Sequence, residues 1–309
     1  MRKFNINLLL FAGLLILIDL AAGRVLRLFY FRQVSGLEYR TTYSMEKSKA
    51  DILVFGTSRA NHHYVPQVFE NAFHQSFYNT GRDGESILYE YAVLKSALTR
   101  YTPKVIILDL LINEFDYDQD SYDRLSCLLP YYRSHPEIRD VVDKMGPLEK
   151  YKLYSSIYPY NSSVLTIIMG NRKNDGEKEL KGYIPLSGAS KVRIDTVRIE
   201  PRPLDSMKIQ VFKNFIKECQ VRGIRLFVVV SPELAPLNNF RSIEIGQTVA
   251  SQCGVPFFNY VQDSCFTGKP KLFYDRTHLN DSGARLFCTR LVNDLQQSGA
   301  TGTGVAAHL

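Results

Sequence analysis

The stretch 52–59, Ile-Leu-Val-Phe-Gly-Thr-Ser-Arg, places a serine directly after a short run of apolar residues. The run predicts a buried strand, and the residues from Ser58 onward predict a helix. Open α/β sheets build their sites at the carboxyl ends of strands, where the next helix offers backbone N–H groups to negative charge. Because a serine hydroxyl needs an activating base, this stretch indicates a site whose chemistry depends on the rest of the chain.

Short apolar runs alternate with helical stretches along most of the chain. Strands are expected over 51–55, 77–79, 105–110, 225–230 and 255–258, and helices over 86–101, 206–222, 241–253 and 282–297. This alternation predicts an α/β fold with a parallel sheet covered on both faces. The third and fourth strands lie too far apart for a normal crossover, so residues 115–203 are predicted to be an insertion or cap within a domain spanning 45–297. We also expect a mobile loop over 171–181 and a disordered tail over 298–309.

Residues 1–32 predict a membrane anchor. Arg2 and Lys3 precede a mostly apolar segment over 6–26 that contains one acid, Asp19. A membrane-spanning helix needs roughly 20 mostly apolar residues. A signal peptide cleaved near 21–23 is the alternative, but the apolar residues that continue to position 31 favour an uncleaved anchor. The two cations at the start favour a cytoplasmic N-terminus, so the body is expected outside the cytoplasmic membrane. Three arginines after the span argue against this orientation.

Composition excludes several classes of partner. The net charge of +7 is mild and the basic residues are scattered, so we expect no nucleic-acid partner. The cysteines have no C-x-x-C pair or zinc-like spacing, which predicts no metal, and we expect no other cofactor. Free thiols are the expected state, and Cys253 with Cys265 is the pair that could bridge in an oxidising compartment.

A base for Ser58 is predicted near the end of the chain, in the turn 274–280. There Asp275 and His278 lie three residues apart, so the carboxylate can orient the imidazole, and the imidazole can take the serine proton. The alternative is a surface turn with a capping aspartate and a solvated histidine. His62 and His63 compete for the role of base, although His62 lies one helical turn past Ser58 and is expected to point away from it.

Charge stabilisation requires fixed hydrogen-bond donors near the reacting carbonyl oxygen. The 79–84 stretch, Asn-Thr-Gly-Arg-Asp-Gly, follows the second strand, and its glycines allow a backbone N–H to approach a ligand. Asn113 follows the third strand. The simpler alternative for the 79–84 stretch is a turn, and for Asn113 it is a residue that caps a loop. Because the carboxyl ends of neighbouring parallel strands share one edge, Ser58, Gly84 and Asn113 are expected to lie together.

These blocks resemble the SGNH (GDSL-like) hydrolases and acyltransferases, which carry a strand-end serine block, an N-x-G-x-x-G block, a strand-end asparagine block and a late D-x-x-H. Here the blocks are 56–58, 79–84, 109–113 and 275–278, in the same order, and the resemblance covers about 50–110 and 223–297. It implies a three-layer α/β/α sandwich with a five-stranded parallel sheet of flavodoxin-like type. It also implies roles for five residues: Ser58 as nucleophile, His278 as base, Asp275 as the group that orients it, and the Ser58 and Gly84 N–H groups with the Asn113 amide as oxyanion donors.

Two of the blocks depart from the family pattern. Thr57 replaces the usual aspartate, which resembles the variant in membrane-anchored relatives that act on cell-envelope polymers. Leu111 and Ile112 replace the glycines expected before Asn113.

The resulting hypothesis is a membrane-anchored serine esterase or O-acyltransferase. It would act on acyl esters, most plausibly acetyl esters, of an envelope or exported glycan through an acyl-Ser58 intermediate. A transferase outside the cell would need a multi-spanning membrane acyltransferase partner to deliver the acyl group. The alternative is a non-catalytic, membrane-anchored glycan-binding or scaffold protein. A metal phosphoesterase built on His62 and His63 lacks a carboxylate cluster at suitable spacing.

Overall fold

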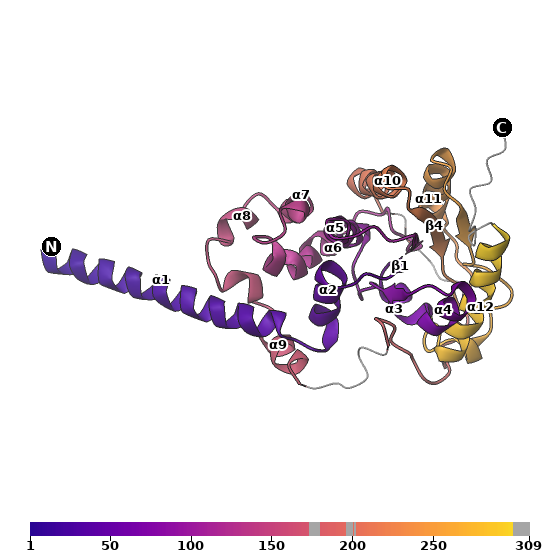
Figure 1. Ribbon diagram of the computed structural model, residues 1–309, viewed down its shortest axis with the longest axis horizontal. Helices are drawn as coiled ribbons and strands as arrows, with labels where there is room; N and C mark the ends of the chain where they lie inside the picture. The colour runs from indigo at the N-terminus through magenta and orange to yellow at the C-terminus, as the bar shows by residue number, and fades with distance from the viewer. Residues whose placement is uncertain (173–179, 196–199, 201, 299–309) are drawn as a thin grey trace.

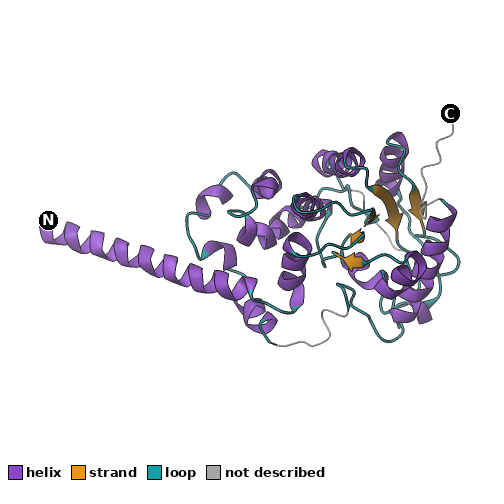
Figure 2. Ribbon diagram, viewed as in Figure 1, coloured by secondary structure: helices purple, strands orange, loops and turns teal. Residues whose placement is uncertain are grey.

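The computed structural model describes residues 1–172, 180–195, 200 and 202–298, and its centre is a five-stranded sheet. All neighbouring strands pair in parallel, in the order β2-β1-β3-β4-β5, with Ile52 opposite both Phe77 and Val105. The strands are β1 (Ile52–Phe55), β2 (Phe77–Asn79), β3 (Val105–Asp109), β4 (Arg225–Val230) and β5 (Phe257–Asn259). The predicted parallel sheet is confirmed (Figure 2).

Helices cover both faces of the sheet. Side chains alternate across a strand, so Leu53 and Ile106 join one hydrophobic cluster while Ile52 and Ile107 join the other. The first face is covered by α5 (Ile87–Leu98), α10 (Ser206–Val221) and α11 (Arg241–Gln252). The second is covered by α3 (Ser58–His63), α4 (Pro66–Phe73) and α12 (Asp281–Gln297). The molecule therefore has the predicted three-layer α/β/α arrangement.

The last strand begins two residues later than the sequence predicts. Val255 closes the end of α11 instead, because its N–H donates to the Ala250 carbonyl at 2.8 Å across Gly254, which has a φ of +67°. The chain becomes extended only after this turn, at Phe257.

Within its described residues, the predicted insertion, 115–203, forms short helical segments rather than strands. Its α-helices are α6 (Gln119–Asp123), α7 (Arg139–Val142), α8 (Glu149–Lys152) and α9 (Val164–Gly170). Its 3-10 turns are η1 (Arg124–Tyr131), η2 (Pro136–Ile138), η3 (Asp143–Met145) and η4 (Tyr158–Tyr160), and one more, η5 (Pro270–Leu272), precedes the turn 274–280. Most of the loop predicted to be mobile, 173–179, and the tail from 299 onward lie outside the described residues.

At the N-terminus, α1 (Arg2–Phe31) projects from the body as a rod, and α2 (Gly36–Glu46) follows it against α5 (Figure 1). By length and composition, α1 can cross a membrane, a criterion that a signal sequence also meets. Its last turns belong to the body, since Tyr30 is buried and its ring packs against those of Tyr131 and Tyr160. All five cysteines are free thiols, so Cys253 and Cys265 form no bridge.

Candidate active site

Ser58 is the first residue of α3, immediately beyond the carboxyl end of β1. Gly56 makes this turn possible. Its φ is +145°, and a Cβ there would lie 2.7 Å from the Ala60 Cβ and 2.9 Å from the Asp109 carbonyl oxygen. Any side chain at position 56 would therefore push α3 away from β3.

His278 and Asp275 lie beside this serine. The His278 Nε2 is 2.8 Å from the Ser58 Oγ, and its Nδ1 is 2.8 Å from the Asp275 Oδ2. The Asp275 Oδ1 accepts the backbone N–H groups of Thr277 and His278 at 2.9 and 2.8 Å. Burial raises the pKa of Asp275, but its hydrogen bonds outweigh burial, and the pKa falls to about 2. As an ionised carboxylate only accepts, Nδ1 carries the imidazole proton and Nε2 is free to accept the serine proton.

The two competing histidines have other partners. His62 Nδ1 is 2.8 Å from the Ile184 carbonyl oxygen, and its ring packs edge-on against His278 at 5.4 Å. His63 Nε2 accepts the backbone N–H of Leu279 at 3.0 Å, which ties the turn bearing His278 to the helix bearing Ser58. Burial lowers the pKa of His63 well below its usual range, so it remains a neutral acceptor.

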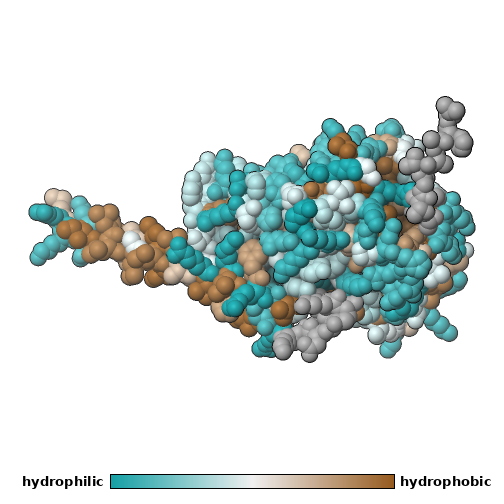
Figure 3. Space-filling model, in the orientation of Figure 1, coloured by the Kyte–Doolittle hydropathy of each residue, from teal (hydrophilic) through white to brown (hydrophobic). Residues whose placement is uncertain are grey.

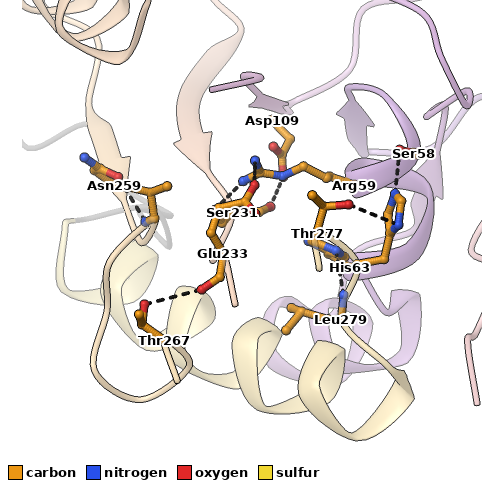
Figure 4. A network of polar contacts seen from close by, with 12 residues as sticks. Ser58, Arg59, His63, Asp109, Ser231, Glu233, Asn259, Thr267, Thr277 and Leu279 are labelled. Atoms are coloured by element: carbon orange, nitrogen blue, oxygen red, sulfur yellow. Dashed lines mark hydrogen bonds and ion pairs between the residues drawn. The ribbon is translucent and has the colours of Figure 1, made fainter. Parts of the chain in front are cut away.

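Behind the serine lies a buried polar network that sequence reasoning missed. Figure 4 shows Arg59 reaching from α3 to the residues that follow β4. Its guanidinium donates to Glu233 at 2.7 Å and to the Ser231 carbonyl, and the Ser231 hydroxyl donates to Asp109. Burial raises the pKa of Glu233 to about 7, even though Arg59 acts in the opposite direction. The signal available in the sequence was position, since Ser231 and Glu233 follow a strand end just as Asn113 does.

A cavity of about 170 Å³ opens beside Ser58, and Gly84 and Asn113 also line it. Gly84 has a φ of +76°. The loop before it is held by Asn79, whose side-chain oxygen accepts the Gly81 N–H at 2.9 Å and whose amide donates to the Ala60 carbonyl at 2.7 Å. The structure thus brings the three expected oxyanion donors to one cavity. Leu111, which stands where the family has glycine, lines the same cavity without closing it.

Beyond these donors the cavity is strongly polar. Three of its lining side chains, Glu85, Ser86 and Glu114, are buried and each has one oxygen with no hydrogen-bond partner among the described residues. Burial raises the pKa of both glutamates. The buried ammonium of Lys208 donates to the Asp116 carbonyl and the Ser121 hydroxyl at 3.1 and 3.0 Å.

Metal binding has no comparable basis. Within the part of the chain that the structure describes, no group of three or more His, Cys, Asp or Glu residues could hold a metal ion.

No family model matches this sequence, and the comparison with curated proteins finds no match. Solved structures give weak likenesses. An acetyl xylan esterase is similar at 13% identity with a TM-score of 0.40, covering 80% of this chain and 98% of that one. A lipase/acylhydrolase from Enterococcus faecalis is similar at 10% identity with a TM-score of 0.40, covering 80% of this chain and 95% of that one. At TM-scores below 0.5, neither likeness assigns an activity to this chain.

Proposed function

We propose that this chain is a serine esterase or O-acyltransferase of the SGNH type, with Ser58 as nucleophile, His278 as general base and Asp275 as the group that orients it. The observation that carries the proposal is the continuous hydrogen-bonded chain from Asp275 through His278 to Ser58. Nucleophile, base and orienting carboxylate within hydrogen-bond reach are the recurring arrangement for acyl transfer through serine.

The proposed reaction begins when His278 Nε2 takes the Ser58 proton as Oγ attacks the acyl carbonyl carbon. The carbonyl oxygen becomes an oxyanion, which the Ser58 and Gly84 N–H groups and the Asn113 amide stabilise. Collapse of this intermediate breaks the bond to the alcohol, which leaves with the proton from His278. The acyl-Ser58 ester is then resolved by water in hydrolysis or by a sugar hydroxyl in transfer, with His278 again as base.

We propose acetyl esters of an envelope or exported glycan as the substrate class. The cavity of about 170 Å³ beside Ser58 has room for a small acyl group and part of a sugar, not for a long acyl chain. Polar residues, among them Glu85, Ser86 and Glu114, line this cavity and would favour sugar hydroxyls over an apolar chain.

We further propose that α1 is an uncleaved anchor and that the body lies outside the cytoplasmic membrane. Cleavage near 21–23 would remove Asp19, which accepts the backbone N–H of Ser156 at 2.7 Å. If the enzyme transfers rather than hydrolyses, its acyl donor would come from a multi-spanning membrane acyltransferase partner, because a single helix offers no path for an acyl group.

Acetate release from an O-acetylated oligosaccharide by the full chain in detergent tests the proposal. Ser58→Ala and His278→Ala should each lower turnover at least about 10³-fold, whereas Ser251→Ala, an exposed serine on α11, should leave it unchanged. Wild-type protein that binds the oligosaccharide and releases no acetate would contradict the enzyme and favour a non-catalytic glycan-binding protein.

A further inference from the structure

The body contacts α1 at Asp19, well before the end of that helix. The Asp19 carboxylate accepts the Ser155 hydroxyl at 2.5 Å, the Ser156 N–H at 2.7 Å and the Ile157 N–H at 3.3 Å. One turn further along, Gly23 lies so close to Ser156 that no side chain would fit between them. The loop 155–157 is therefore fixed at the level of Asp19, not at the end of the helix.

The length of the free part of α1, which projects beyond these contacts, determines where the membrane lies relative to the body. Residues 4–18 project without polar side chains other than Asn5 and Asn7, and fifteen helical residues span about 22 Å. A hydrocarbon core is about 30 Å thick, so a helix that spans it needs about five residues more than these fifteen. The hydrocarbon layer of the membrane then extends along α1 as far as Gly23. An acid at that depth requires hydrogen-bond partners, and the loop 155–157 supplies three to Asp19.

The chain immediately before this loop has the character of a membrane interface. Leu148, Tyr151 and Tyr154 are exposed by 63%, 55% and 81%, and their spacing of three puts them on one side of a helical turn. Two lysines lie between them, and Tyr154 is the direct neighbour of Ser155. Exposed tyrosines and lysines are the usual composition of the headgroup zone. We call residues 148–154 the docking segment; it contains α8, which Figure 1 shows at the end of the body from which α1 projects.

Positive charge gathers at the same level. A cavity of about 180 Å³ between α1 and the body is lined by Arg24, Arg27 and Arg133, and the Arg133 guanidinium donates to the Leu153 carbonyl within the docking segment. Arginines lining a cavity at this level could bind the phosphate of an anionic phospholipid. Figure 3 shows the mostly apolar surface of α1 running to the body, where polar and apolar colours mix.

We propose that the docking segment and the arginine cavity bind the surface of a bilayer containing anionic phospholipid. The body then contacts the membrane directly and is not attached to it through α1 alone. The inference rests on the anchor proposed above and goes beyond the esterase activity. Its consequence is a fixed height of Ser58 above the membrane, and hence a limit on which part of an envelope polymer the site can reach.

The absence of tryptophan from the sequence makes a direct test available. Three single substitutions in the full chain serve as fluorescent reporters: Tyr154→Trp in the docking segment, Leu14→Trp within the free part of α1, and Val221→Trp on α10, where the side chain is 76% exposed. Each is reconstituted in vesicles of phosphatidylcholine and phosphatidylglycerol, with and without bromine on the acyl chains of the phosphatidylcholine.

Bromine should quench the Tyr154→Trp and Leu14→Trp reporters and leave Val221→Trp unquenched. Omitting phosphatidylglycerol should reduce quenching of Tyr154→Trp only. Quenching at position 14 with none at 154 would overturn the proposal, and equal quenching at 154 without anionic lipid would overturn the role given to the arginines. No quenching at position 14 would overturn the premise that α1 spans the bilayer, and acetate release by the same samples shows independently whether the esterase proposal stands.

Discussion

Replacing Asp275 with asparagine should inactivate the site by moving one proton. The Asp275 Oδ1 holds two backbone N–H groups, while Oδ2 accepts the Nδ1 proton of His278. Asparagine has one acceptor oxygen, and the two backbone donors claim it, so its NH₂ group faces Nδ1. Nδ1 must then accept, the imidazole proton moves to Nε2, and Nε2 can no longer take the proton of Ser58.

The expected loss is large. The corresponding substitution in a Ser-His-Asp enzyme lowers kcat about 10⁴-fold, which equals about 5 kcal/mol in the activation free energy. The assay is kcat for hydrolysis of p-nitrophenyl acetate by the full chain in detergent. Asp281→Asn is the matched control, because that carboxylate binds Tyr183 and Arg285 and not His278. An Asp275→Asn protein that unfolds like wild type yet keeps kcat within about tenfold of it would refute the tautomer argument.

Three further predictions concern the scaffold. Gly56→Ala should lower the free energy of unfolding, measured in urea, by about 3 kcal/mol, because backbone strain and overlap with α3 and β3 add. Gly223 has a φ of +65° but lies in open space, so Gly223→Ala should lower it by about 1 kcal/mol. Equal losses in the two variants would contradict the overlap. Burial raises the pKa of Glu233 from 4.5 to about 7, so its contribution to stability is complete below pH 4.5 and is lost as pH rises through 7. Urea midpoints measured across that range should vary less with pH in Glu233→Gln than in wild type, and parallel curves would contradict this. His63→Phe should leave the buried N–H of Leu279 without an acceptor, which should lower the free energy of unfolding by about 1–3 kcal/mol and also lower kcat. His63→Gln should restore part of the stability and part of kcat. A fully active, fully stable His63→Phe protein would show that this contact does not position the base.

Much of the sheet and of the proposed triad could be predicted from local sequence. Apolar runs bounded by turn residues mark buried strands, and carboxyl ends of neighbouring parallel strands share an edge, so Ser58, Gly84 and Asn113 could be expected together. Asp275 and His278 lie only three residues apart, and such a short spacing restricts how the two side chains can meet.

The buried charges behind the site could not be predicted in this way. Arg59 and Glu233 are distant in sequence, and each, taken alone, is a residue expected at the surface. The same holds for α2, whose residues lack an apolar pattern. Arg40 and Thr41 are nevertheless buried there, because Arg40 donates to Asn61 at 2.6 Å and Thr41 accepts from Arg82 at 3.0 Å. Polar burial of this kind is decided by partners that only the folded chain brings together.

Covalent labelling of Ser58 is the most direct test of the central claim. The full chain in detergent is treated with a fluorophosphonate, digested, and the modified peptide identified by mass spectrometry. The proposed mechanism predicts one adduct on Ser58, slower labelling in His278→Ala and none in Ser58→Ala. A wild-type protein that stays unlabelled, or a Ser58→Ala protein that labels equally well, would contradict the assignment of Ser58 as the nucleophile.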